Sequence, residues 1–174
     1  MTVPALADPR HEFGPTAIAL HWLVAGLAVA ALATGFGVAN GSEAAVGLLR
    51  MHAILGALAG MLSAIRLVQW LMRLRSPNRH ETRSIAVRLV HLALVVIPVG
   101  MLASGIGMMV LSGAGAILFG GAPAPLPDFG VYPPRTAHGA GAYALAALAG
   151  LHAAAALYHH LWRRDNTLRA MWFR

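Results

Sequence analysis

The sequence predicts an all-α integral membrane protein, a four-helix bundle, and three observations support this. Apolar residues make up 58% of the 174 residues and charged residues only 11%, and the mean hydropathy is +0.66. A water-exposed surface usually carries far more charge, so the apolar runs need lipid as their solvent. Four of these runs are rich in Ala, Leu, Val and Gly and are long enough to cross about 30 Å of hydrocarbon, where such a run is stable as a helix.

The four predicted helices cover residues 16–38, 45–72, 85–111 and 136–162, and they form a single transmembrane domain over residues 1–174. Arginines gather in the connection between the second and third helices and in the C-terminal tail: Arg73, Arg75, Arg79, Arg83, Arg88, Arg163, Arg164, Arg169 and Arg174. Basic segments stay in the cytoplasm, so we expect both termini on the cytoplasmic side.

The charge and the missing cysteine exclude several classes of function. The net charge is +7, but the arginines flank apolar segments, which fits membrane topology and does not indicate a nucleic-acid partner. The chain contains no cysteine. Thiolate-bound iron–sulfur clusters, covalently attached haem and zinc–thiolate sites are therefore excluded.

Histidines are unexpected inside apolar helices, because an imidazole in a membrane span needs a partner or a metal. With the topology above, His21 lies near the cytoplasmic side and His52 near the periplasmic side. His138 begins the fourth helix on the periplasmic side. His152 follows 14 residues later, which is about 21 Å and close to four turns, so His138 and His152 share one face.

These positions predict two pairs of histidines on two levels, His52 with His138 near the outside and His21 with His152 near the inside. Paired neutral imidazoles are axial ligands of b-type haem, so we expect two b haems between the helices. A single histidine is more often a hydrogen-bonded core residue. Zinc is the main competing metal, but zinc sites usually add carboxylates or cysteines, and the spans contain no aspartate.

Several neighbouring residues have two interpretations each. Arg66 lies 14 residues after His52 on the same face and either binds a haem propionate or reaches the cytoplasmic headgroups. Small residues beside the histidines leave room for a porphyrin or for a neighbouring helix; they are Gly56, Gly139, Gly141 and Gly150.

Three further histidines lie in or at the end of the predicted helices. His91 has no partner at its level and is expected to be structural, or to lie near the inner haem or a quinone. His159 and His160 end the fourth helix and precede Arg163 and Arg164. This cluster is either a basic cap at the membrane interface or a quinone site in which His159 contacts the quinone.

Several segments resemble the small bacterial cytochrome b561 proteins, most closely the di-haem superoxide oxidase (superoxide:ubiquinone oxidoreductase) type. The run His152-Ala-Ala-Ala-Ala-Leu-Tyr-His-His160, followed by Asp165-Asn-Thr-Leu168, is similar to their C-terminal helix. Weaker likenesses cover the other helices: Ile18-Ala-Leu-His-Trp-Leu23, Met51-His52 with Gly56 and Arg66, and His91 with Met108-Met109.

The resemblance implies a multi-pass protein of the bacterial inner membrane with haem ligation by His21, His52, His138 and His152. It also implies that ubiquinone binds near His159 at the cytoplasmic side and that superoxide arrives at a basic periplasmic opening. Arg50 and Arg135 lie near that surface and can supply the positive field. Residues 112–135, which should form much of the opening, match no recognisable motif.

Two functional hypotheses follow. In the first, the protein is a stand-alone enzyme that oxidises superoxide to O2 and reduces ubiquinone. In the second, it is a cytochrome b subunit that links a periplasmic dehydrogenase or hydrogenase to the quinone pool, and it then needs a contact patch for that redox partner. The outer connections are short apart from residues 112–135, and this favours the enzyme. A transporter or a purely structural bundle would leave the paired histidines unexplained.

Overall fold

The computed structural model describes residues 14–39, 45–74, 84–123 and 125–172. Its long helices are α1 (Pro15–Ala39), α2 (Ala45–Leu74), α3 (Ile85–Ser112) and α5 (Pro134–Tyr158), the last continued by the π-helical turn η3 (His159–Arg163). All four are long and apolar enough to span a membrane, and no strand occurs among the described residues, which confirms the predicted all-α membrane fold. Most of the predicted arginine-rich connection falls on residues 75–83, which lie outside the described residues, as does Arg174.

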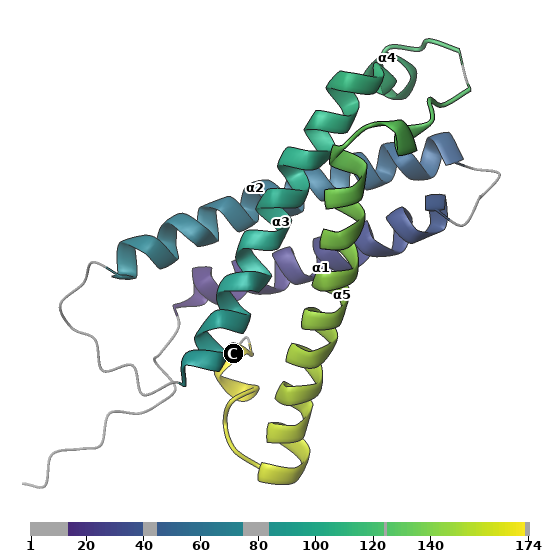
Figure 1. Cartoon of the computed structure of the whole chain (residues 1–174). Helices are drawn as coiled ribbons and strands as arrows, with labels where there is room; N and C mark the ends of the chain where they lie inside the picture. The colour runs from purple at the N-terminus through teal and green to yellow at the C-terminus, as the bar shows by residue number, and fades with distance from the viewer. Residues whose placement is uncertain (1–13, 40–44, 75–83, 124, 173–174) are drawn as a thin grey trace, which may run out of the picture.

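The long helices pack in series, α1 against α2, α2 against α3, and α3 against α5 (Figure 1). The helices α2 and α3 approach closely at Gly60, where an added Cβ would lie 2.6 Å from the Cβ of Leu102 and 3.0 Å from the carbonyl oxygen of Pro98. Helix association in lipid depends on such close packing, because the lipid itself is apolar. The α2–α3 contact therefore joins two helix pairs, α1 with α2 and α3 with α5.

The connection between α3 and α5 contains structure that the sequence analysis did not predict. It begins with α4 (Ala114–Phe119), after Gly113 in the left-handed region at φ 69°, and includes the 3-10 turn η2 (Phe129–Val131). Leu118 is fully buried, and its carbonyl oxygen accepts a hydrogen bond of 2.6 Å from Nε of Arg50. This bond fixes α4 against the start of α2.

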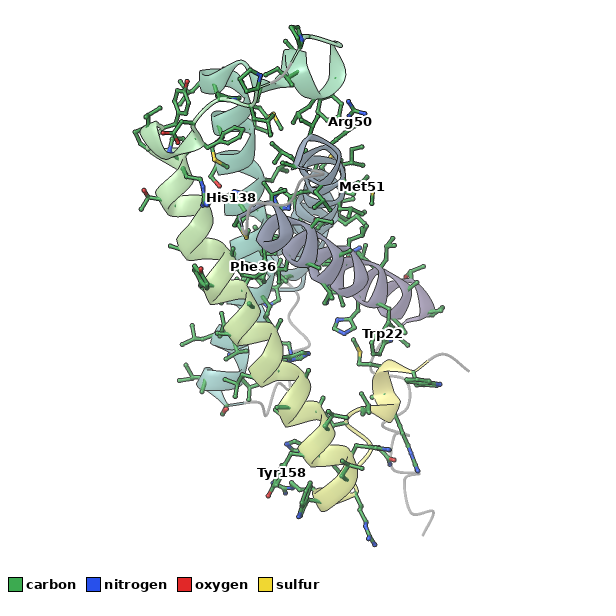
Figure 2. All side chains as sticks on the ribbon, turned by 90° about the vertical axis from the view of Figure 1, so that its right-hand side faces the viewer. Trp22, Phe36, Arg50, Met51, His138 and Tyr158 are labelled. Carbon is green, nitrogen blue, oxygen red and sulfur yellow. The ribbon has the colours of Figure 1, made fainter. Side chains whose placement is uncertain are left out.

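The chain after α5 folds back toward α1. Arg164 takes the left-handed conformation (φ 52°), and the 3-10 turn η4 (Arg169–Met171) follows. Trp22 on α1 donates a 2.6 Å hydrogen bond from Nε1 to the carbonyl oxygen of Met171, and its ring lies 6.1 Å from that of Trp172. Figure 2 shows Trp22 extending from α1 toward this segment. The C-terminal segment therefore closes one end of the bundle beside His21, the neighbour of Trp22 in the chain.

Substitution of Gly60 by alanine is expected to destabilise the bundle, because the new methyl group must displace Leu102 or the backbone of α3. Overpacking of this kind costs about 1–3 kcal/mol. Thermal melting of the detergent-solubilised protein measures the effect. The control is Gly47→Ala on the same helix, where a Cβ meets no atom of the described residues. Equal melting temperatures for the two variants would contradict the proposed packing.

Candidate functional site

The first histidine pair joins α2 and α5. The rings of His52 and His138 lie with their centroids 5.8 Å apart and their planes at 77°. Both side chains are half-buried, and Figure 2 shows His138 at the same end of the bundle as Arg50 and opposite to Tyr158. The two residues that topology assigned to one level therefore face each other across the helices.

Hydrogen bonds hold both rings of this pair through Nδ1. His52 donates from Nδ1 to the carbonyl oxygen of Ala31 on α1, at 2.8 Å. His138 Nδ1 lies 3.0 Å from Oγ of Ser104, whose hydroxyl donates to the carbonyl oxygen of Met101 at 3.0 Å. Since that hydroxyl hydrogen is used, His138 donates to Ser104 from Nδ1. In the neutral rings, each Nε2 then carries a free lone pair.

Nε2 of His138 is buried and has no hydrogen-bond partner among the described residues. A buried polar atom without a partner costs about 1–3 kcal/mol, so native proteins rarely leave one without a function. An imidazole whose Nδ1 is bound to an outer acceptor while Nε2 stays open is the usual arrangement of a metal-ligating histidine.

Two glycines that the sequence analysis did not single out make room for these rings. A Cβ at Gly35 would lie 2.8 Å from Cε1 of His52, and a Cβ at Gly105 would lie 3.6 Å from Cε1 of His138. Gly35 therefore has to lack a side chain if His52 is to keep its position. In the sequence, both residues are indistinguishable from other glycines of apolar helices.

The second pair joins α1 and α5, and a third histidine lies beside it. The centroids of His21 and His152 are 6.2 Å apart, with the planes at 63°. The ring of His91 on α3 lies 5.1 Å from that of His152, at 87°, so the prediction that His91 has no partner at its level is wrong. His91 donates from Nδ1 to the carbonyl oxygen of Val87 at 2.7 Å, which fixes its ring along α3.

Arginines accompany both pairs. Arg66, half-buried on α2, interacts electrostatically with His21 and His152, so it lies at the level of the second pair. Arg135, half-buried at the start of α5, interacts in the same way with His138. The side chain of Arg50 is exposed at that end of the bundle, apart from its bond to α4. Each histidine pair therefore has a guanidinium in its electrostatic reach.

His159 lies at the opposite end, where α5 passes into the π-helical turn. Its Nδ1 is 2.5 Å from Oδ2 of Asp165, and both side chains are about one-third exposed. Oδ1 of Asp165 accepts a 3.0 Å hydrogen bond from the backbone N–H of Thr167. The hydrogen bonds from Thr167 and then from His159 hold the pKa of Asp165 well below its usual range, so the carboxyl group is ionised at neutral pH.

Two shallow, open hollows lie at this end of the bundle. One, of about 280 Å³, is lined by His160, Leu168, Arg169 and Trp172. The other, of about 480 Å³, is lined by Leu161, Trp162 and Arg164. Both combine apolar side chains with arginines or a histidine.

The model of one protein family, prokaryotic cytochrome b561, matches residues 12–174. The chain belongs to the prokaryotic cytochrome b561 family. No curated protein is similar enough to count as a match. Membership makes the chain a multi-pass bacterial membrane cytochrome that binds b-type haem and transfers electrons. Haem, and not zinc, is therefore the group to test against the histidines.

The spacing of the two histidine pairs in this cytochrome fits haem iron. Metal–imidazole bonds are about 2 Å long, so two rings that share one metal ion have centroids roughly 6 Å apart. The separations of 5.8 Å in the first pair and 6.2 Å in the second agree with this value. The 5.1 Å between His91 and His152 is shorter than either of these separations.

The four glycines that the sequence analysis singled out fall into two groups. A Cβ at Gly141 would lie 3.1 Å from Cγ of Met101, and one at Gly139 would lie 2.9 Å from Nη1 of Arg135. At Gly56 and Gly150 a Cβ would meet no atom of the described residues. Close packing of α5 on α3 therefore explains why position 141 holds a glycine. No contact with the described residues explains the glycines at positions 56 and 150.

Substitution of Gly35 by alanine is expected to lower the haem content of the cytochrome, because the methyl group displaces the His52 ring. Loss of the groups that orient a metal ligand typically reduces metal affinity about 10- to 100-fold. The haem-to-protein ratio of the purified protein, from the pyridine haemochrome spectrum, checks this. Gly37→Ala is the control, because its Cβ would be in ordinary contact, 3.5 Å from Leu48. A full haem content in Gly35→Ala would disprove the role of Gly35.

Proposed function

We propose that this cytochrome oxidises superoxide at the end of the bundle that carries Arg50 and Arg135, and reduces ubiquinone at the end that carries His159. Two superoxide ions lose one electron each and leave as O2, and one ubiquinone gains two electrons and two protons to become ubiquinol. The observation that carries the proposal is the pair of imidazole couples on two levels, each with the ring spacing of a shared metal ion.

The proposal assigns two b haems to these couples, one to His52 and His138 and the other to His21 and His152. Haem supplies a one-electron redox centre when it is bound. The open Nε2 of His138 and the anchored Nδ1 of His52 support the first assignment. Arg66 lies within electrostatic reach of the second couple and is the residue we assign to a haem propionate, since guanidinium pairs well with carboxylate.

Superoxide is a small anion, and positive charge at the entrance raises its rate of encounter. Arg135 supports this role, because it lies within electrostatic reach of His138. Arg50 keeps its charge while its Nε is bound to Leu118. We place this end in the periplasm and the termini in the cytoplasm of a bacterial inner membrane, as the arginine distribution predicts.

At the other end, His159 is proposed to contact the quinone carbonyl. Ubiquinone is apolar and reaches such a site from the lipid. Leu161 and Trp162, which follow His159 in the π-helical turn and line the larger hollow at this end, are exposed, and this supports access from the lipid.

The alternative function is a cytochrome b subunit that receives electrons from a periplasmic dehydrogenase or hydrogenase. One observation favours it. Phe119 on α4 and Val131 on η2 are 58% and 69% exposed, and they lie in the connection that is expected to face the periplasm. Exposed apolar side chains at such a place suit a protein partner.

Purified cytochrome mixed rapidly with superoxide and a soluble ubiquinone analogue separates the two functions. The enzyme proposal predicts fast haem reduction and ubiquinol formation without a second protein, followed by absorbance. If superoxide leaves the haem oxidised while a partner dehydrogenase reduces it, the subunit reading is correct.

The pairing of ligands predicts which variants lose the same haem. His52→Ala and His138→Ala should each lose one of two haems and retain part of the other, whereas His21→Ala should affect the second. The haem-to-protein ratio and the redox titration of the remaining haem distinguish the two. Loss of the same haem from His21→Ala and His52→Ala would show that the pairing is wrong.

The steering role predicts that Arg135→Gln slows haem reduction by superoxide and weakens its dependence on ionic strength. Removing one charge near the entrance is expected to lower the rate by a few-fold, which is less than the about 10- to 1,000-fold effect of a whole electrostatic field. Stopped-flow rates at several salt concentrations measure this. Arg163→Gln, an exposed arginine at the opposite end, is the control. Identical salt dependence in both variants would disprove steering by Arg135.

A further inference from the structure

The end of α5 brings a carboxylate back onto His159. The π-helical turn over His159–Arg163 is closed by Arg164, and the N–H of Asp165 then donates to the carbonyl oxygen of His159 at 3.2 Å. The side chains of the same two residues meet at 2.5 Å. Backbone and side chain of Asp165 therefore both hold His159.

The backbone adopts an unfavourable conformation to make this contact. Arg164, at φ 52°, is the one non-glycine residue with positive φ in the part of the chain that the structure describes. A side chain in this region costs about 1–2 kcal/mol, and π-helical turns are rare and often lie at functional sites. Because α5 ends in this way, Asp165 turns back toward His159. In a continued α-helix, Asp165 would lie further along the helix axis, away from His159.

The hydrogen bonds of Asp165 define which nitrogen of His159 is available. Oδ1 is bound to the N–H of Thr167, and Oδ2 faces His159. With its pKa held low by Thr167 and then by His159, the carboxylate only accepts. The hydrogen between them is therefore on Nδ1 of His159, and Nε2 is the nitrogen that remains for a ligand.

We propose that Asp165 is a positioning residue for proton delivery to the quinone, with His159 as the group that transfers the proton. This inference rests on the proposed quinone reduction and extends it to the source of the protons. Asp165 fixes the ring through Nδ1 and balances the positive charge of the imidazole while Nε2 also carries a proton, as the carboxylate does in other aspartate–histidine couples.

The chemistry balances with the electrons of the proposed reaction. Each of the two quinone oxygens takes one proton as the ring takes two electrons. The N–H bond at Nε2 of His159 breaks as an O–H bond forms on the oxygen nearest to it, and the other oxygen takes its proton from water. Water then returns a proton to Nε2. His159 and Asp165 are 35% and 37% exposed, so water can reach the couple.

The test uses the full-length, haem-loaded cytochrome with Asp165→Asn. The protein is reduced with dithionite, and its reoxidation by a soluble ubiquinone analogue is followed by stopped-flow absorbance. Asparagine keeps the size of the side chain, and its amide oxygen can still accept the hydrogen bond from the N–H of Thr167. It has no negative charge, however, to stabilise the Nδ1–H group of His159. We expect kcat for quinone reduction to fall about 100-fold, in the range for general acid catalysis. KM for quinone should change less than about twofold, and the haem spectrum should stay the same.

Two further variants separate positioning from a structural cap. Asp165→Glu keeps the negative charge and should restore part of kcat. Asp128→Asn is the matched control, because Asp128 caps the N–H of Gly130 in the same way, at 2.8 Å, in the connection before α5. It should reoxidise at the rate of the unaltered protein.

The outcomes distinguish this inference from the proposed function. If the unaltered protein is not reoxidised by quinone, both are overturned. If it is reoxidised and Asp165→Asn keeps its kcat, only the role of Asp165 is overturned. A loss of haem or a large rise in KM in Asp165→Asn, with no recovery in Asp165→Glu, would also overturn it, because the residue would then be a structural cap.

Discussion

An imidazole inside an apolar membrane helix is costly unless its ring nitrogens have partners, and the rest of the site depends on this constraint. The helices satisfy Nδ1 of His52 and His138 with groups from other helices, the carbonyl oxygen of Ala31 and the hydroxyl of Ser104. None of the described residues forms a hydrogen bond with Nε2 of His138. Because neutral imidazole carries one hydrogen, each bond to Nδ1 also decides that Nε2 presents a lone pair. Hydrogen bonds from α1 and α3 would thus prepare this pair for the haem that we propose here, although neither helix contributes a ligand to the pair.

The C-terminal segment connects the His159–Asp165 couple with the second histidine pair, His21 and His152. The turn that places Asp165 against His159 also directs the chain toward α1, where the carbonyl oxygen of Met171 accepts the hydrogen bond from Trp22. Trp22 adjoins His21 in the sequence, and their rings are 5.4 Å apart. The proposed quinone end and the second histidine pair are therefore parts of one packed unit. A change in the turn after α5 can be expected to reach His21 through this contact.

The sequence was sufficient for the helices and for bringing His52 level with His138 and His21 level with His152, because both follow from hydrophobic length and from the rise per residue. The residues around the rings could not be predicted in this way. Gly35 and Ser104 matter only because of how α1 and α3 are rotated against their neighbours. The level of His91 depends on how far α3 is shifted along α5. The spacing of residues within one helix carries no information about this shift. The π-helical turn adds one residue to the register after His159, and no residue type marks such an insertion.

The histidine pairs also bear on how the bundle holds together. Helices in lipid gain little from burying apolar side chains, so association depends on packing and on polar contacts. Among the described residues, α1 packs closely on α2 and α5 on α3, but neither α1 nor α2 packs closely on α5. The pairs cross these two loosely joined interfaces, His21 with His152 from α1 to α5 and His52 with His138 from α2 to α5. Ligation by the proposed haems would then join the two helix pairs at both ends of the bundle. Because a group that binds only the folded protein adds its binding free energy to stability, assembly of this cytochrome and loading of its haem are expected to be coupled.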